Sequence, residues 1–384
     1  MDLECAKITD FSQHSISKSQ MALLHADQDT ESVESVSNQI ITKIPKTLNG
    51  RRSKLIVHLD LNNTVLLSDT VTRQGPRKAL SSFLTTVTWG RINQEGQWEW
   101  LSNVPSLNPP CDGAVSYYSQ FGKPLDFTET SDGSLFKKIF TDHLQTVEWQ
   151  DPPNELLSIT DEDGKKYHRI LPSFFELIDC LSSQGREFAI ILRTFGSDLS
   201  RTLKTIQVTL SGQHPQYQHL QMKHFPLRIS PGKIRCNKKN VVLTLGSERI
   251  STQSSPRAVY HYFSSLEGIV GFQDHFDWWA RNNFSNHGGK PFWIDPSETE
   301  IQHIFIDDNI RLNDAESIVH PQVFVEDGAG TRIASTSELY DICLVQTDLL
   351  GAIHDRNYFI KCVQQCEENY RILKTSPTFK TINY

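Results

Sequence analysis

The chain has 384 residues, of which 38% are apolar, and its 38 lysines and arginines stand against 45 acidic residues, giving a formal net charge of −7. A chain of this length can bury a sizeable core without disulfides or bound metals. Its acidic balance argues against a nucleic-acid-binding protein, because such proteins usually carry a basic excess. The sequence also contains no apolar run close to the roughly 18 residues that a membrane helix needs.

The composition further predicts a soluble cytoplasmic protein. Residues 1–5 are acidic and lack an apolar core, so they do not resemble a secretory signal. The seven cysteines are odd in number and scattered, which is typical of a reducing compartment and not of a disulfide framework. Neither a membrane nor a nucleic acid is therefore expected as a partner.

Residues 1–50 differ in composition from the rest of the chain. They are rich in Ser, Gln, Thr and Asp and poor in aromatic residues. A segment of this kind buries too little apolar surface to offset the entropy that it loses on ordering. We therefore expect a disordered N-terminal tail.

Three short apolar runs predict strands that are covered on both faces. These runs are residues 54–59, 188–193 and 304–306. Helical patterns lie before the second run and between the second and third, at residues 173–181, 199–210 and 266–283. Strands that alternate with helices predict an α/β fold, with a Rossmann-like parallel sheet and helices on both of its faces.

About 130 residues separate the first predicted strand from the second, far more than a simple crossover connection needs. Hairpin signals occur within this segment at residues 89–100 and 156–170, the second of them around an Asp-Gly pair. We therefore predict an inserted cap module at residues 70–155 with β-hairpin content. The core would then consist of residues 51–69 and 156–384.

Four of the seven tryptophans fall in the predicted cap module, at positions 89, 98, 100 and 149. Aromatic side chains mostly serve to bury area, so we expect these residues to form the core of the module. The alternative that one of them faces a substrate remains open.

Polar side chains follow each of the three predicted strands. Parallel α/β sheets bind ligands at the carboxyl ends of their strands, so these side chains are expected to converge on one crevice. The residues concerned are Asp60 and Asn62 after the first strand, Thr194, Phe195 and Gly196 after the second, and Asp307 and Asp308 after the third.

This set of motifs resembles the haloacid dehalogenase-like superfamily of phosphohydrolases. The family's first motif is an apolar strand followed by Asp-x-Asp-x-Thr/Val, and residues 59–64 read Leu-Asp-Leu-Asn-Asn-Thr. Its second motif is a strand that ends in Thr or Ser, here Thr194. Its third is a lysine upstream of the last motif, here Lys290. Its fourth is a strand that ends in Asp-Asp or Gly-Asp, here residues 307–308.

The resemblance implies a nucleophile and a metal site. Asp60 would attack phosphorus and form an aspartyl phosphate, which splits one difficult displacement into two easier steps. A bound Mg²⁺ would suit an all-oxygen site with few carboxylates. Its ligands would be Asp60, Asp308 and the backbone carbonyl of Asn62, with Asp307 outside them or bound through water.

The resemblance also implies a phosphate-binding set. Thr194 and the amides of Phe195 and Gly196 would hold phosphoryl oxygens at a helix start, and Lys290 would add a positive charge. Two structural alternatives stay open, because Thr194 also suits a helix cap and Lys290 also suits the surface. Arg193 is interpreted as a member of a structural ion pair.

Asn62 departs from the family pattern, whose second aspartate acts as the general acid and base. An amide transfers no proton at neutral pH, and such help is worth roughly 10²–10⁴-fold. The first hypothesis is a Mg²⁺-dependent phosphatase of reduced activity that acts on a small-molecule or protein phosphate ester. The others are a phosphotransferase with a longer-lived phosphoenzyme and a catalytically weak binding or regulatory protein.

Overall fold

The chain divides into two units, Met1–Gly50 and Arg51–Tyr384. The computed structural model describes residues 53–69, 72–124, 126–221, 225–325 and 330–375, all of which belong to the second unit. The tail predicted at residues 1–50 lies outside the described residues.

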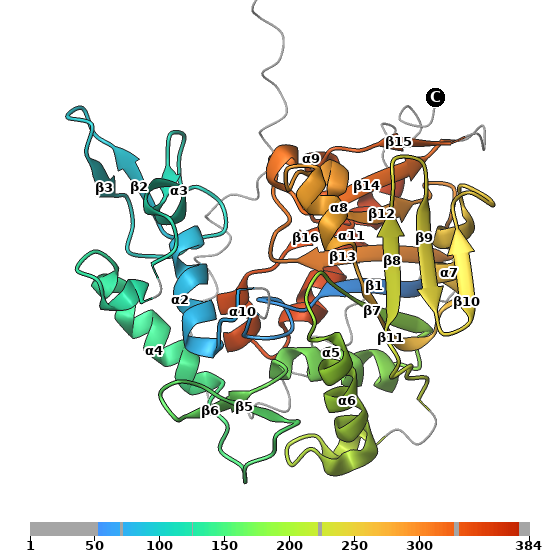
Figure 1. Cartoon of the computed structure of the whole chain (residues 1–384), viewed down its shortest axis with the longest axis horizontal. Helices are drawn as coiled ribbons and strands as arrows, with labels where there is room; N and C mark the ends of the chain where they lie inside the picture. Colours follow the sequence, from blue (N-terminus) through green and yellow to red (C-terminus); the bar gives the residue numbers. More distant parts are fainter. Residues whose placement is uncertain (1–52, 70–71, 125, 222–224, 326–329, 376–384) are drawn as a thin grey trace, which may run out of the picture. The chain divides into compact units, whose positions relative to one another are not determined.

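An eight-stranded sheet with strand order β10-β9-β8-β11-β7-β1-β13-β16 organises the described residues (Figure 1). The strand β1 pairs in parallel with β7 on one side and with β13 on the other. The bounds of the eight strands are β1 Lys54–Asp60, β7 Phe188–Thr194, β8 Gly232–Cys236, β9 Val241–Leu245, β10 Glu248–Ser251, β11 Gly268–Gln273, β13 Ile301–Asp307 and β16 Leu344–Gln346. The α/β class and the three predicted strands, which are β1, β7 and β13, are thereby confirmed.

The prediction of a parallel sheet is only partly right, because the sheet is mixed. In the part of the sheet that runs β8-β11-β7-β1-β13-β16, every neighbouring pair of strands is parallel. The pairs β8–β9 and β9–β10 are antiparallel. Tight turns join these three strands, and a tight turn can only connect antiparallel neighbours. In the first turn, Oδ1 of Asn237 accepts hydrogen bonds from the amides of Lys239 and Asn240. The second turn contains Gly246 at φ +59°.

The helix predicted at residues 266–283 is wrong in its first half, which forms β11. This strand is apolar and contains a β-branched pair, Ile269-Val270, and its backbone begins with Gly268 at φ +70°. Only Phe276–Arg281 is helical, as α8. The missed strand lies between β7 and β8, so it is internal to the sheet and buried along most of its length.

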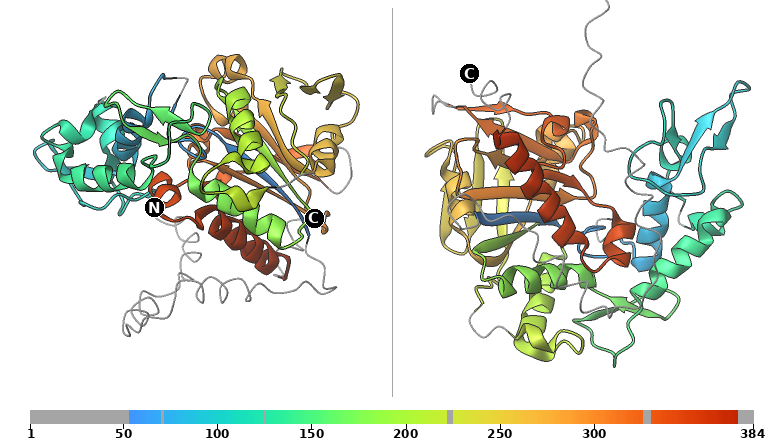
Figure 2. Two further views of the ribbon diagram at one scale, coloured as in Figure 1. Left: turned by 90° about the horizontal axis from the view of Figure 1, so that it is seen from below. Right: turned by 180° about the vertical axis from the view of Figure 1, so that it is seen from behind.

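The two faces of the large sheet are covered differently. On one face, β1 packs Leu55, Val57 and Leu59 with residues of α5 (Pro172–Ser183) and α11 (Tyr358–Thr375). Figure 2 shows α11 lying across the strands on this face. On the other face, Ile56 packs with residues of α7 (Ala258–Ser265) and of a small sheet. The small sheet consists of β12 (Lys290–Ile294), β14 (Val319–Phe324) and β15 (Thr331–Ile333). Helices on both faces are thus only part of the covering, because one face also carries a second sheet.

The segment between β1 and β7 contains both predicted hairpins. The strands β2 (Trp89–Ile92) and β3 (Trp98–Trp100) form the first, and β5 (Ser158–Thr160) and β6 (Lys166–His168) form the second. Its other elements are α2 (Pro76–Val87), β4 (Val115–Ser116), α3 (Tyr117–Phe121) and α4 (Lys137–Thr146). A bridge from Glu148 to Tyr167 joins the end of residues 70–155 to the second hairpin. The division into a cap and a core stays a prediction.

Three of the four tryptophans of this segment, Trp98, Trp100 and Trp149, pack against other aromatic rings. Trp100 stacks on Tyr117 at a centroid distance of 5.7 Å and meets Phe136 edge-on at 5.0 Å. Trp149 meets His168 edge-on at 4.9 Å. These contacts agree with the interpretation of the tryptophans as packing residues.

The remaining elements are short helices at the ends of the sheet strands and in the connections. They are α6 Leu199–Val208, α9 Thr336–Leu339, α10 Leu349–His354, a π-turn at Thr209–Gln213 and 3₁₀ turns at Phe127–Glu129, Gly133–Phe136, Gln218–Leu220, Asn286–Gly288 and Asp314–Glu316.

A buried ion pair joins β7 to the residue that follows β11. Arg193 donates from Nε and Nη2 to the two carboxylate oxygens of Asp274, at 2.9 and 2.6 Å, and neither side chain is exposed. This bidentate contact confirms the interpretation of Arg193 as a structural ion-pair residue.

We predict that Asp274→Asn lowers the free energy of unfolding by about 3–5 kcal/mol, because it leaves the Arg193 charge buried without a counter-charge. Equilibrium urea unfolding measures this change. Asp277→Asn makes the same chemical change at an exposed position and serves as the control. Equal effects of the two substitutions would contradict the prediction.

Candidate functional site

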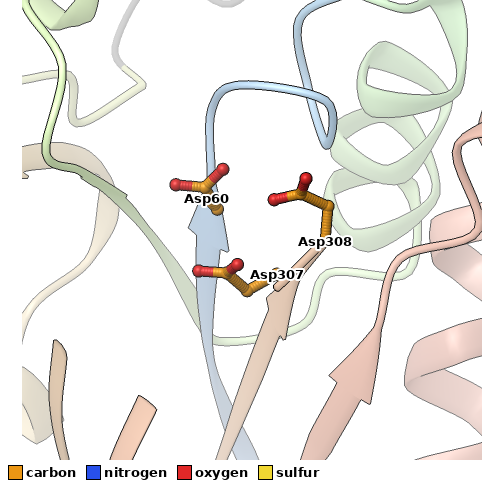
Figure 3. Close-up of side chains that lie close together, drawn as sticks. All are labelled: Asp60, Asp307 and Asp308. Atoms are coloured by element: carbon orange, nitrogen blue, oxygen red, sulfur yellow. The ribbon is translucent and has the colours of Figure 1, made fainter. Parts of the chain in front are cut away.

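Three carboxylates meet at the carboxyl end of the large sheet. Asp60 is the last residue of β1, Asp307 is the last residue of the neighbouring strand β13, and Asp308 follows it. One oxygen from each carboxylate lies within 4.8 Å of the others, and all three residues are buried. Figure 3 shows the three side chains facing a common space above the strand ends. The parallel pairing of β1 with β13 thus brings together residues that are far apart in the sequence.

The ammonium group of Lys290 lies against this cluster. Lys290 is the first residue of β12 and is only 1% exposed, so the alternative of a surface lysine is wrong. Its Nζ donates to Oδ1 of Asp60 and, at 2.8 Å, to Oδ2 of Asp307. The small sheet therefore contributes the cation, and the large sheet contributes the carboxylates.

Burial makes the charges of the cluster unfavourable. It raises the pKa of Asp60 well above its usual range, with Lys290 opposing this change and the two neighbouring carboxylates adding to it. Burial and the charge of Asp307 raise the pKa of Asp308 to about 7. Burial also disfavours the charged form of Lys290, but Asp307 and Asp60 outweigh it and raise the pKa of Lys290. Ionising all three carboxylates would leave two negative charges beyond the charge of Lys290, and an added cation would favour that ionised state.

Two threonines form hydrogen bonds with the main chain that carries Asp307 and Asp308. The Oγ1 of Thr64 accepts the amide of Asp308 at 3.1 Å and lies 3.2 Å from Oγ1 of Thr347. The amide of Thr347 donates to the main-chain carbonyl of Asp307 at 3.1 Å. Thr64 occupies the last position of the first motif, which is a sequence signal for its role. Thr347 has no such signal, because it reaches the site from the end of β16.

Asn309 orients the two aspartates of the last motif. Its amide donates to Oδ1 of Asp307 at 2.8 Å, and its side-chain Nδ2 donates to Oδ1 of Asp308 at 2.9 Å. Arg311 donates to the main-chain carbonyl of Asp308. Asn309 therefore holds one oxygen of Asp307 and one oxygen of Asp308 in place.

The predicted phosphate-binding residues follow β7, beside the Asp60 strand. Oγ1 of Thr194 accepts the amide of Gly196 at 2.9 Å, so this amide is satisfied within its own turn. The helix α6 begins only at Leu199 with Asp198 as its capping residue. The start predicted for this helix at residue 199 is confirmed, but the turn precedes it, so Phe195 and Gly196 lie outside the helix and the alternative of Thr194 as a helix cap is wrong.

The ring of Phe195 covers the lysine from above the strand ends. Its centroid lies 5.4 Å from Nζ of Lys290, and the ring stacks on Trp279 at 4.9 Å and 5°. An aromatic face next to an ammonium group provides a weak electrostatic attraction and excludes water.

Asn62 lies in the turn after Asp60. Its Nδ2 donates to Oδ1 of Asp69 at 3.3 Å, whereas its Oδ1 is buried and has no hydrogen-bond partner among the described residues. The neighbouring Asn63 has a backbone φ of +55°. Its Oδ1 is also buried and has no hydrogen-bond partner among the described residues. The contact with Asp69 had no sequence signal, because it depends on how the chain folds back after the turn.

The donor atoms of the cluster fit a hard divalent cation. They are carboxylate oxygens from Asp60, Asp307 and Asp308. Oxygen ligands of this kind suit Mg²⁺ and Ca²⁺, whereas soft metals prefer sulfur or imidazole. Burial is the main cause of the raised pKa of Asp60 and Asp308, and a bound cation would lower both values by favouring the ionised carboxylates.

Comparisons of the chain with family models, with curated proteins and with solved structures find no match. Among the described residues, no helix has both the length and the apolar character needed to cross a membrane.

We predict that Asp308→Asn stabilises the metal-free protein by about 1–2 kcal/mol above pH 7. The folded protein keeps the Asp308 proton up to about pH 7, whereas an unfolded chain loses it near pH 4. Raising the pH through this window therefore destabilises the wild type, and the variant lacks this loss. The difference in the free energy of unfolding between the variant and the wild type should therefore grow from pH 4 to pH 7.

Urea unfolding in EDTA at several pH values measures this difference. Asp112→Asn, at an exposed position, controls for the loss of one surface charge. If the difference in the free energy of unfolding did not change with pH, the result would contradict the assignment of this destabilisation to the Asp308 carboxylate.

Proposed function

We propose that the protein is a Mg²⁺-dependent phosphohydrolase of the haloacid dehalogenase-like type, which acts through an aspartyl phosphate on Asp60. The observation that carries the proposal is the buried Asp60 carboxylate at a strand end, bonded to Lys290 and clustered with Asp307 and Asp308. Residues 51–69 and 156–384 would be the catalytic core, and residues 70–155 would be the cap over it.

Mg²⁺ would be held by Asp60, Asp308 and the main-chain carbonyl of Asn62, with Asp307 bound through water. When bound, the ion supplies positive charge against the phosphoryl oxygens, which a carboxylate nucleophile would otherwise repel. The all-oxygen donor set and the incomplete charge compensation of the cluster support this assignment.

In the first step, a carboxylate oxygen of Asp60 forms a bond to phosphorus while the bond from phosphorus to the ester oxygen breaks. The leaving oxygen takes up a proton from a water molecule. In the second step, water attacks phosphorus, the bond to Asp60 breaks, and inorganic phosphate is released with the carboxylate restored. Lys290 neutralises charge near the transferred group in both steps, and the hydroxyl of Thr194 is placed beside it at the end of β7.

Asn62 limits the proton transfers of this scheme. Its Nδ2 can orient a leaving oxygen or a water molecule but cannot give up a proton at neutral pH. Substrates with good leaving groups should therefore react best, and the aspartyl phosphate should live longer than in an enzyme with a carboxylate at this position. A phosphotransferase activity from the same intermediate follows the same chemistry.

We predict that the wild type releases phosphate from 4-nitrophenyl phosphate in the presence of Mg²⁺ and that Asp60→Asn abolishes this release. The amide of the variant is not a nucleophile. A malachite-green phosphate assay with and without EDTA measures the rate. Asp112→Asn makes the same change at an exposed site and should keep full activity. Equal rates for Asp60→Asn and the wild type would refute the proposal, and absence of turnover on a broad ester panel would favour the non-catalytic binding protein.

We further predict that Asn62→Asp raises kcat about 10²-fold for alkyl phosphates, whose leaving groups need protonation, and less for 4-nitrophenyl phosphate. The gain reflects general acid catalysis by the new carboxylate. Comparison of kcat on the two substrate types measures it. An equal or lower kcat on alkyl phosphates would contradict the role assigned to position 62.

A further inference from the structure

A cavity of about 270 Å³ lies beside the turn that carries Asn62. Its wall is formed by the segment after β1, by the β5–β6 hairpin region and by the first turns of α6. We call it the arginine pocket, after the three arginines that line it with two aspartates and a threonine: Arg73, Arg169, Arg201, Asp69, Asp198 and Thr202.

Two of its guanidinium groups share one acceptor. Nη2 of Arg169 and Nη2 of Arg201 both donate to the main-chain carbonyl of Glu155, at 2.9 and 3.0 Å. The other hydrogen bonds of Arg169 also go to main-chain carbonyls, those of Leu156 and Ser158. The positively charged side chains of Arg169 and Arg201 are thus bonded to uncharged main-chain carbonyl groups.

Among the described residues, no carboxylate forms an ion pair with Arg73, Arg169 or Arg201. The buried Arg193, in contrast, is paired with Asp274. Burial and the charge of Arg201 together lower the pKa of Arg169 to about 10, while the charge of Asp198 opposes this change. The pocket's three guanidinium groups exceed its carboxylates by one charge. An anion that entered the pocket would therefore meet donors already in place and charge that is not yet compensated.

Hydrogen bonds join the wall of the pocket to the proposed catalytic turn. Asp69 in its wall accepts the hydrogen bond from Nδ2 of Asn62, and the amide of Leu66, also in its wall, donates to the carbonyl of Leu61 next to Asp60. Its opposite wall belongs to α6, which follows the Thr194 turn. Asn62 thus lies two residues after Asp60 and is bonded to a residue that lines the pocket.

We propose that the arginine pocket binds a second anionic group of the substrate, a carboxylate or a phosphate, while the phosphoryl group to be transferred lies at Asp60. This proposal rests on the proposed function. The volume suffices for such a group, since a water molecule occupies about 30 Å³. Planar guanidinium groups suit both anions because they can donate two parallel hydrogen bonds.

The first test measures anion binding without turnover. Inorganic phosphate is added to the protein in EDTA, where the metal-free carboxylate cluster repels anions, at an ionic strength held constant with sodium chloride. We expect a saturable rise of the wild-type unfolding temperature by about 2 °C or more. Arg201→Gln, whose amide can still donate to Glu155, should lose this rise. Lys204→Gln removes the same charge from an exposed position of the same helix and should keep it. An equal rise in wild type and Arg201→Gln would overturn the pocket as an anion site.

The second test asks whether the anion belongs to the substrate. Phosphate monoesters of ω-hydroxycarboxylic acids with two to six carbons are compared with the matched n-alkyl phosphates. We expect the wild type to prefer at least one carboxylate ester in kcat/KM by about tenfold, and Arg201→Gln to lose this preference. Arg73→Gln provides a second variant on a different segment, should Arg201→Gln fold poorly.

The two tests separate failure of this proposal from failure of the proposed function. Turnover without a preference for any carboxylate ester, together with an Arg201-dependent phosphate effect, would overturn the substrate assignment and leave a free anion as the ligand. Turnover of no ester, together with the same phosphate effect, would overturn the phosphohydrolase and the substrate assignment with it. The anion pocket itself would stand in both cases.

Discussion

The buried ammonium group of Lys290 is the interaction on which the site depends. It connects three strands, because Lys290 begins β12 and bonds to Asp60 at the end of β1 and to Asp307 at the end of β13. An unpaired buried carboxylate costs several kcal/mol. Lys290 opposes the effect of burial on the pKa of Asp60, although that pKa stays well above its usual range. The same contact ties the small sheet to the large one, so the cation serves both the fold and the proposed chemistry.

The compensation by Lys290 is incomplete, and the remaining negative charge is what makes the cluster a candidate site. A purely structural arrangement would resemble Arg193 and Asp274, where one cation meets one anion in a bidentate pair. Here one cation lies against three carboxyl groups, and burial raises the pKa of Asp60 and Asp308. Perturbed carboxylates that a fold maintains against its own stability are typical of functional sites.

The sequence allowed the convergence of Asp60, Asp307 and Asp308 to be predicted, because each follows an apolar run and parallel strands end at one edge. The strand β11 was missed, because residues 266–283 also contain helix-compatible spacing and Gly268 favours no regular element by itself. The turn of Gly196 on Thr194 and the shared contact of Arg169 and Arg201 with Glu155 depend on local folding and long-range packing. No spacing in the sequence encodes them, so only the structure reveals the arginine pocket.

The pairing of β1 with β13 also constrains how the protein folds. Asp60 and Lys290 are separated by 230 residues, and β1 can gain its partner β13 only after more than two thirds of the chain has emerged from the ribosome. Contacts of such long range are slow to form, because the entropy of closing the loop is lost before they contribute. During synthesis, the apolar strand β1 therefore waits with one edge unpaired. The step that protects this edge from aggregation is the same step that assembles the carboxylate cluster.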